Sequence, residues 1–99
     1  MIRHVVMWEL KATDPAEKVD VARRIRDDFR TLPPLIKEIR AIQVGINVLH
    51  VDRNFDVVLI ADFHDLADLE LYLQHPAHQK VAAYVRSVTS DRRAVDFEV

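Results

Sequence analysis

Residues 2–10 read IRHVVMWEL, and hydrophobic side chains stand on both sides of this segment. The period-two alternation with β-branched residues predicts a strand. His4 and Trp8 share one side of it. Val5 and Met7 share the other side, which a strand half-exposed to water would normally fill with polar residues. The pattern therefore predicts a sheet whose second face is covered by another molecule.

Working outward from this strand, strand-like and helix-like patterns alternate along the chain. Pro15 suits the first position of a helix that Asp14 caps, and Asp65 suits the cap of another. Proline interrupts the helical spacing at Pro76. The expected elements, in order, are a strand at 2–10, a helix from Asp14 to the Pro33-Pro34 pair, strands at 38–48 and 55–63, a helix from Asp65 to Pro76, a helix at 77–88 and a strand at 91–99.

This order is β-α-β-β-α-β with the second helix in two pieces, which is the ferredoxin-like arrangement. The chain is expected to be one α+β domain over residues 1–99, with a four-stranded antiparallel sheet and helices on one face only. Val58 and Ile60 carry the apolar character onto the second face of the third strand. Pairing with an identical sheet is the commonest way to cover such a face, so we expect a homodimer.

The composition excludes several classes of function. Charged residues make up 30% of the chain with a net charge of −2, which predicts neither nucleic-acid nor anionic-membrane binding. The absence of cysteine excludes disulfides, thiolate metal sites and a cysteine nucleophile. No apolar run approaches the length of a membrane span, and the chain opens directly on a strand pattern without a signal peptide. We therefore expect a soluble cytoplasmic protein.

Three polar side chains are expected to point into the space between sheet and helices. His78 lies on one helical stripe with Val81 and Val85, and His4 is on the helix-facing side of the first strand. Tyr72 borders the apolar stripe of the preceding helix. A buried polar group without a partner costs about 1–3 kcal/mol, so these groups must bond one another, backbone, water or a ligand. An apolar space with a few convergent polar groups is the usual pattern of a binding pocket.

The same residues admit a plain structural interpretation and a chemical one. Each could be a core residue whose polar atoms are satisfied locally, with the Tyr72 hydroxyl reaching the surface. Alternatively, histidine titrates in the range that a general base needs, and the hydroxyl of Tyr72 could orient His78 or donate to an oxyanion. From spacing alone both interpretations stay open.

A metal site is the weaker alternative. His75 and His78 are three residues apart, and His64 or Asp62 could add ligands, but Pro76 makes their directions uncertain and no HExxH spacing exists. We predict no metal and no cofactor.

Other catalytic motifs lack support in the sequence. Ser87 and Ser90 lack the strand-to-helix elbow of a nucleophilic serine. No glycine-rich phosphate loop is present either.

Five short segments together resemble the stress-responsive A/B barrel (Dabb) domain family. They span nearly the whole chain in the family's order, and their histidine-proline element is the most specific of them: residues 2–8, 44–47, 69–72, 75–78 and 95–98. The resemblance implies a dimeric α+β barrel, in which two ferredoxin-like sheets pack face to face. Many members of that family have no established biochemical role.

The resemblance also implies roles for the inward residues. The pattern is similar to that of a plant polyketide cyclase of this family, which closes a linear chain by an aldol condensation. His78 would correspond to its general base, Tyr72 to that base's partner and His4 to a pocket histidine. Residues 26–29, Arg-Asp-Asp-Phe, stand where the cyclase has a pocket tyrosine, so the substrate does not carry over.

Four functions are therefore weighed. The first is a domain that binds a small apolar or aromatic ligand through His4, Trp8, Tyr72 and His78. The second is a cofactor-independent cyclase-like or isomerase-like enzyme with His78 as base and Tyr72 as its partner. The third is a cofactor-free oxygenase, which shared architecture alone suggests. The fourth is an assembly protein whose paired sheets are its function.

Overall fold

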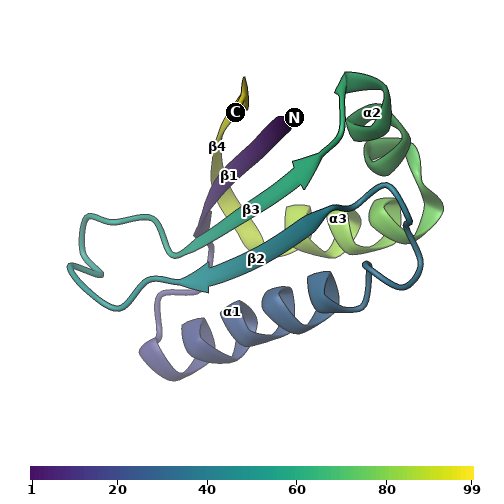
Figure 1. The fold of residues 1–99 in the computed structure, drawn as a ribbon. Coiled ribbons are helices and arrows are strands. Elements are labelled where there is room, and N and C mark those ends of the chain that lie inside the picture. Colours follow the sequence, from purple (N-terminus) through teal and green to yellow (C-terminus); the bar gives the residue numbers. More distant parts are fainter.

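The computed structural model describes residues 1–99 and confirms the predicted order of elements (Figure 1). The second helical segment is divided at His75, as the proline predicts. The elements are β1 (Ile2–Leu10), α1 (Pro15–Arg30), β2 (Ala41–Ile46), β3 (Val57–Phe63), α2 (Leu66–Gln74), α3 (Pro76–Val88) and β4 (Thr89–Glu98).

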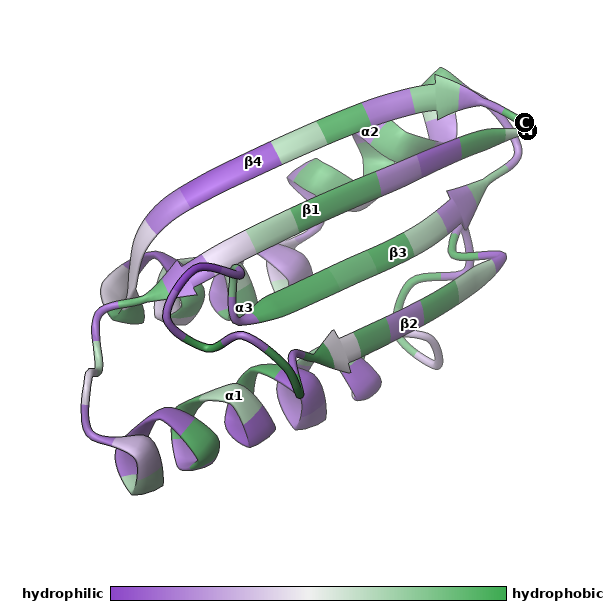
Figure 2. Ribbon diagram, turned by 90° about the vertical axis from the view of Figure 1, so that its left-hand side faces the viewer, coloured by the Kyte–Doolittle hydropathy of each residue, from purple (hydrophilic) through white to green (hydrophobic).

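The four strands form one antiparallel sheet in the order β2-β3-β1-β4, the topology of the ferredoxin-like fold (Figure 2). Buried and less buried residues alternate along β1 and β3, so each strand turns one side toward the core. The core lies between this side of the sheet and the helices. It includes Trp8 stacked on Phe29 of α1, with ring centroids 5.8 Å apart.

Short side-chain bonds fix where each helix begins. The Asp14 carboxylate accepts from the Glu17 amide at 3.0 Å, and the Asp65 carboxylate accepts from the Asp68 amide at 2.9 Å. These caps satisfy amides that have no partner inside the helix, and both were predicted. His75 caps α3 by accepting from the Ala77 amide at 3.0 Å.

Two predicted strands are shorter in the structure. Residues 38–40 form turns before β2, and the segment from Asn47 to Asp56 is a loop rather than strand. The predicted bounds of 38–48 and 55–63 were therefore wrong at these ends. Leu32 and Ile36, which precede the first of these strands, fill the core from an irregular segment. The last strand begins two residues earlier than predicted.

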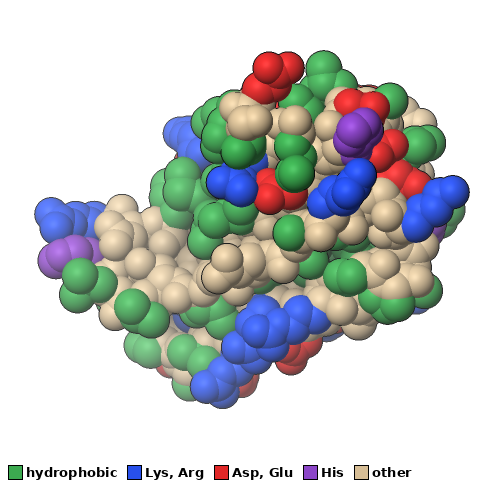
Figure 3. All heavy atoms as spheres, viewed as in Figure 1, with side chains coloured by type: hydrophobic (Ala, Val, Ile, Leu, Met, Phe, Trp, Pro, Cys, Tyr) green, Lys and Arg blue, Asp and Glu red, His purple; other side chains and the backbone are tan.

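The face of the sheet away from the helices, here called the open face, carries exposed hydrophobic side chains. Met7 is 41% exposed, Val95 61% and Phe97 42%. Val5 of β1 and Val95 of β4 are directly paired, so their side chains lie side by side. The side of the molecule seen in Figure 3 mixes charges of both signs with hydrophobic groups. The open face therefore has the apolar character that the sequence predicted.

Gly45 lies where the sheet leaves no room for a side chain. A Cβ atom at this position would lie 3.0 Å from Cγ1 of Val58, its partner across the β2–β3 pair. The single glycine of the chain thus marks a close approach, one of the two explanations that a glycine inside a strand suggests. None of the helices is both long enough and apolar enough to cross a membrane.

Candidate functional site

The structure brings His4, Tyr72 and His78 together between β1 and the two short helices. The ring centroids of Tyr72 and His78 lie 4.3 Å apart, and those of Tyr72 and His4 lie 6.3 Å apart. All three line one cavity of about 320 Å³. Trp8 lines the same cavity, as expected for a residue on the same side of β1 as His4. The remaining wall is mostly apolar: Val6, Phe29, Leu59, Leu73, Ala82 and Val85, with Gln79, Arg86 and Arg92.

His78 is held by the break between α2 and α3. In a continuous helix the Leu73 carbonyl would accept a hydrogen bond from the Ala77 amide. Here the Ala77 amide donates instead to Nδ1 of His75, the residue that caps α3. The Leu73 oxygen instead lies 3.1 Å from Nδ1 of His78. A carbonyl only accepts, so Nδ1 carries the proton and the lone pair of neutral His78 is on Nε2. Proline at position 76 thus creates the acceptor that orients this ring.

The environment of His78 keeps its ring neutral. Burial of the imidazole lowers its pKa from the ordinary histidine value, and the positive charge of Arg86 acts in the same direction. The bond to Leu73 opposes this shift without cancelling it. A half-buried histidine with a lowered pKa is unprotonated at neutral pH, which is the form that accepts a proton.

Tyr72 is fully buried at the centre of the group. Its ring packs between Phe63, at 4.8 Å between centroids, and His78. Its hydroxyl is buried and has no hydrogen-bond partner within the chain. Burial raises the pKa of the Tyr72 phenol, so the group stays protonated and keeps a hydrogen to donate. The interpretation in which this hydroxyl reaches the surface was wrong.

His4 is tied to the last strand rather than left free. Its Nδ1 bonds the carboxylate of Asp96, the residue that faces it across the β1–β4 pair. The carboxylate fixes the ring orientation and leaves Nε2 as the other polar atom of His4. Asp96 was not predicted as a site residue. The alternation along β4 shows that Asp96 points away from the side of Val95 and Phe97, but only the pairing of β4 with β1 places it on the helix-facing side.

The other histidine and acidic candidates do not join this group. The Nδ1 atom of His75 caps α3, and His64 is exposed. Asp62 points to the open face, where Arg3 binds its carboxylate at 2.8 and 3.0 Å. No cluster of three His, Cys, Asp or Glu side chains is arranged to hold a metal ion. The side chains considered above as possible metal ligands, those of His75, His78, His64 and Asp62, therefore do not come together in the structure.

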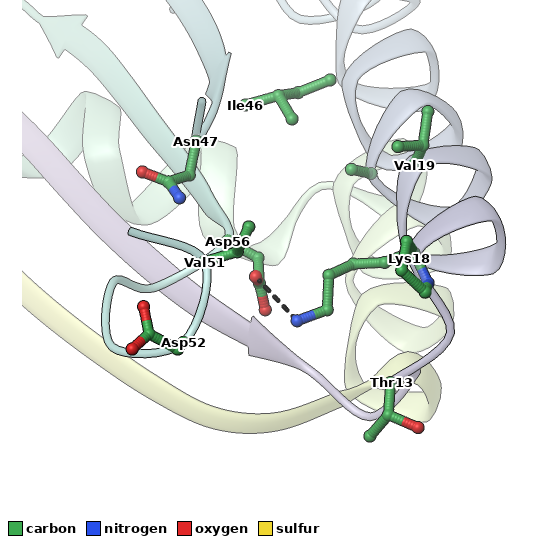
Figure 4. Close-up of a pocket in the computed structure, with 10 residues that line it drawn as sticks. Thr13, Lys18, Val19, Ile46, Asn47, Val51, Asp52 and Asp56 are labelled. Carbon is green, nitrogen blue, oxygen red and sulfur yellow. Dashed lines mark ion pairs between the residues drawn. The ribbon is translucent and has the colours of Figure 1, made fainter. Parts of the chain in front are cut away.

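A second cavity, of about 360 Å³, lies between α1 and the loop that joins β2 to β3 (Figure 4). Lys18 extends from α1 toward Asp56, and its Nζ lies 3.2 Å from the carboxylate. Asp56 is buried and also accepts from the Leu10 amide at 2.8 Å. The sequence reasoning missed this cavity because its loop has no periodic pattern. The Lys18–Asp56 pair and the bond from the Leu10 amide hold the end of this loop against β1.

Solved structures of other proteins have the same fold as this chain. A dimeric protein of unknown function from Bacteroides fragilis is 27% identical, with a TM-score of 0.89 over 99% of this chain and 95% of that one. A dimeric protein of unknown function from Thermobifida fusca is 24% identical, with a TM-score of 0.83 over 99% and 90%. Both are described as ferredoxin-like, which confirms the predicted fold class.

Enzymes also share this fold. The hydroxynitrile lyase of Passiflora edulis is 19% identical, with a TM-score of 0.80 over 99% of this chain and 92% of that one. At this identity the likeness concerns the fold alone. No curated protein matches the sequence.

The sequence model of the stress responsive A/B barrel domain matches residues 2–99, which is nearly the whole chain. This match agrees with the resemblance carried by the strand histidine and by the histidine-proline element. The chain therefore belongs to the stress responsive A/B barrel domain family.

Proposed function

We propose that the protein is a cytoplasmic homodimer that binds a small apolar or aromatic ligand in the cavity lined by His4, Trp8, Tyr72 and His78. The observation that carries this proposal is Tyr72, which lines the cavity and whose buried hydroxyl has no partner within the chain. Buried polar groups in folded proteins are almost always hydrogen-bonded. A ligand that accepts a hydrogen bond from this hydroxyl would supply the missing partner.

The size and lining of the cavity support the same proposal. Its volume of about 320 Å³ falls at the lower end of the range for small-molecule sites, about 300–1,000 Å³. Aromatic rings of Trp8 and Phe29 form part of its wall. Such rings favour flat, apolar ligands with one or two polar groups.

A matched pair of substitutions on α3 tests the ligand site. Ala82 lines the cavity, whereas Ala83 is its exposed neighbour. Ala82→Phe fills the cavity, and Ala83→Phe adds the same ring outside it. In NMR titrations with a panel of bicyclic aromatic compounds, we expect shifts at Tyr72 and His78 in the wild type and in Ala83→Phe. Equal shifts in Ala82→Phe, or none in the wild type, would contradict the proposal.

The exposed open face supports the homodimer. Met7, Val95 and Phe97 are hydrophobic side chains of one sheet face that no helix covers. The B. fragilis and T. fusca proteins with this fold are dimeric, which favours the same covering here. Two identical open faces packed together would remove these side chains from water.

Sedimentation velocity tests the dimer with two variants. Val95→Asp places a charge at the open face and is expected to give a folded monomer, because burying an unpaired carboxylate is strongly unfavourable. Val51→Asp changes an equally exposed valine of the β2–β3 loop and should remain dimeric. A wild-type monomer at 100 micromolar, or a dimer that Val95→Asp leaves intact, would refute this part.

A second candidate function is proton abstraction next to a carbonyl group, and the geometry of His78 favours it. The neutral ring has its lone pair on Nε2, and the adjacent ring of Tyr72 carries a hydroxyl with a hydrogen to donate. Nε2 would accept a proton from the carbon beside the carbonyl, while Tyr72 would stabilise the oxygen of the resulting enolate. Return of a proton to carbon regenerates both groups.

Hydrogen–deuterium exchange tests this candidate without knowledge of the substrate. The protein is incubated with 4-phenyl-2-butanone in D₂O, and NMR follows the loss of the protons next to the carbonyl. Catalysed exchange in the wild type that disappears in His78→Gln supports a base at this position. Equal exchange in the two proteins excludes that role for His78 and leaves the ligand site standing.

A further inference from the structure

Two arginines stand at the cavity that His4, Tyr72 and His78 line. Arg86 continues the α3 stripe of His78 and Ala82 at four-residue intervals, so these residues share one side of the helix. Arg92 of β4 faces Trp8 across the β1–β4 pair and therefore lies on the helix-facing side of the sheet. The two arginines thus line the same cavity, one from a helix and the other from a strand.

Neither of these arginines has a carboxylate partner. The seven ion pairs of the structure include neither Arg86 nor Arg92. Arg93, the next residue of β4, lies on the opposite side of the strand and pairs with Asp91 at 3.3 Å. Asp91 also accepts a hydrogen bond from the backbone amide of Arg92, but it does not pair with the Arg92 side chain. The charges at the cavity are therefore available to a ligand.

The wall of this cavity carries positive charge, whereas the whole chain has a negative net charge. The chain has 16 acidic residues and a net charge of −2, yet none of the residues that line this cavity is Asp or Glu. The cavity beside α1 differs, because Asp52 and Asp56 accompany Lys18 there. The Asp96 carboxylate is bound to His4, and Arg86 and Arg92 are solvent-exposed residues of this wall. Two arginines without a carboxylate partner attract an anion even where water reaches them.

We propose that the cavity takes an aromatic carboxylate, with its ring against Trp8 and Phe29 and its carboxylate bound by Arg86 and Arg92. The planar guanidinium matches a carboxylate with two parallel hydrogen bonds. Trp8 and Phe29 stack on each other in the wall and offer aromatic surface to the ring. This inference rests on the proposed ligand site and adds the chemical class of the ligand.

Two probes of equal shape separate charge from shape. 2-Naphthoate and 2-naphthamide differ in charge but hardly in size, and calorimetry measures the affinity of each. We expect 2-naphthoate to bind about tenfold more tightly than the amide, because hydrogen bonds to a charged group are the stronger ones. Arg86→Gln and Arg92→Gln should each weaken 2-naphthoate binding about fivefold and leave 2-naphthamide unchanged. Higher ionic strength should weaken only the carboxylate.

Arg93→Gln is the matched control, since it removes the same charge from the opposite side of β4. It should leave both affinities unchanged. Equal affinities for the two probes, unaffected by Arg86→Gln and Arg92→Gln, would overturn the inference while the ligand site remains. If neither probe shifts the NMR signals of Trp8 and His78, the proposed ligand site fails as well. A loss of carboxylate binding in Arg93→Gln equal to that in Arg92→Gln would also overturn the inference.

Discussion

Removing the hydroxyl group of Tyr72 is expected to make the ligand-free protein more stable. The hydroxyl is buried and unpartnered, whereas in the unfolded chain it is hydrogen-bonded to water. Leaving such a group unpaired costs about 1–3 kcal/mol, and we take the low end of this range. Tyr72→Phe should raise the free energy of unfolding by about 1 kcal/mol, or the melting temperature by about 4–8 °C.

The same substitution is expected to weaken ligand binding. If the ligand is the partner of the hydroxyl, its affinity should fall about fivefold in Tyr72→Phe, which corresponds to about 1 kcal/mol. Stability would be measured by urea unfolding at a fixed protein concentration, because dimerisation makes stability depend on concentration. Tyr84→Phe, a half-buried tyrosine on α3, serves as control and should change stability by less than about 0.5 kcal/mol.

One outcome would refute the reasoning about this hydroxyl. A loss of stability of 1 kcal/mol or more in Tyr72→Phe would mean that the hydroxyl is already bonded in the free protein, for instance to a buried water. The Tyr72 hydroxyl would then no longer indicate a ligand. A gain in stability together with undiminished affinity would instead place the ligand elsewhere.

Three further outcomes follow from the structure. Asp56→Ala should lower the free energy of unfolding by about 3 kcal/mol in urea denaturation, because it leaves the Lys18 charge and a buried amide unpaired. The lowered pKa of His78 makes stability decline as pH falls below about 6.5, where the unfolded chain binds the proton first. His78→Gln should therefore show a shallower loss of stability across this range in thermal unfolding at stepped pH, and an unchanged slope would contradict the shift. Gly45→Ala should cost about 1 kcal/mol through its contact with Val58, and Val58→Ala should relieve part of that cost in the double variant, as chemical denaturation would show.

The inward histidines and Tyr72 could be anticipated from the sequence because regular periodicity fixes direction. Alternation on β1 places His4 with Trp8, and the stripe on α3 places His78 with Val81 and Val85. Pro76 also signalled the break that orients His78. What periodicity does not give is the distance between groups on different elements. The full burial of Tyr72 was therefore missed.

The edge strand β4 shows why other site residues were missed. Hydrophobic residues of a strand normally face the core, so Val95 and Phe97 suggested that Asp96 faces water. In the structure the open face takes the hydrophobic residues, and the helix-facing side receives Arg92 and Asp96. Only the register against β1 reveals this reversal, and register is a tertiary property. Arg86 was overlooked although a signal was available, because it continues the four-residue spacing of His78 and Ala82 on α3.

A crystal structure of the protein with 2-naphthoate tests most directly whether the cavity between sheet and helices is a ligand site. We expect the compound beside Trp8, with its carboxylate bound by Arg86 and Arg92. The opposite result is a cavity that holds only water bonded to Tyr72 while the compound sits on another surface. That result would contradict the ligand site and leave the family and the fold unchanged.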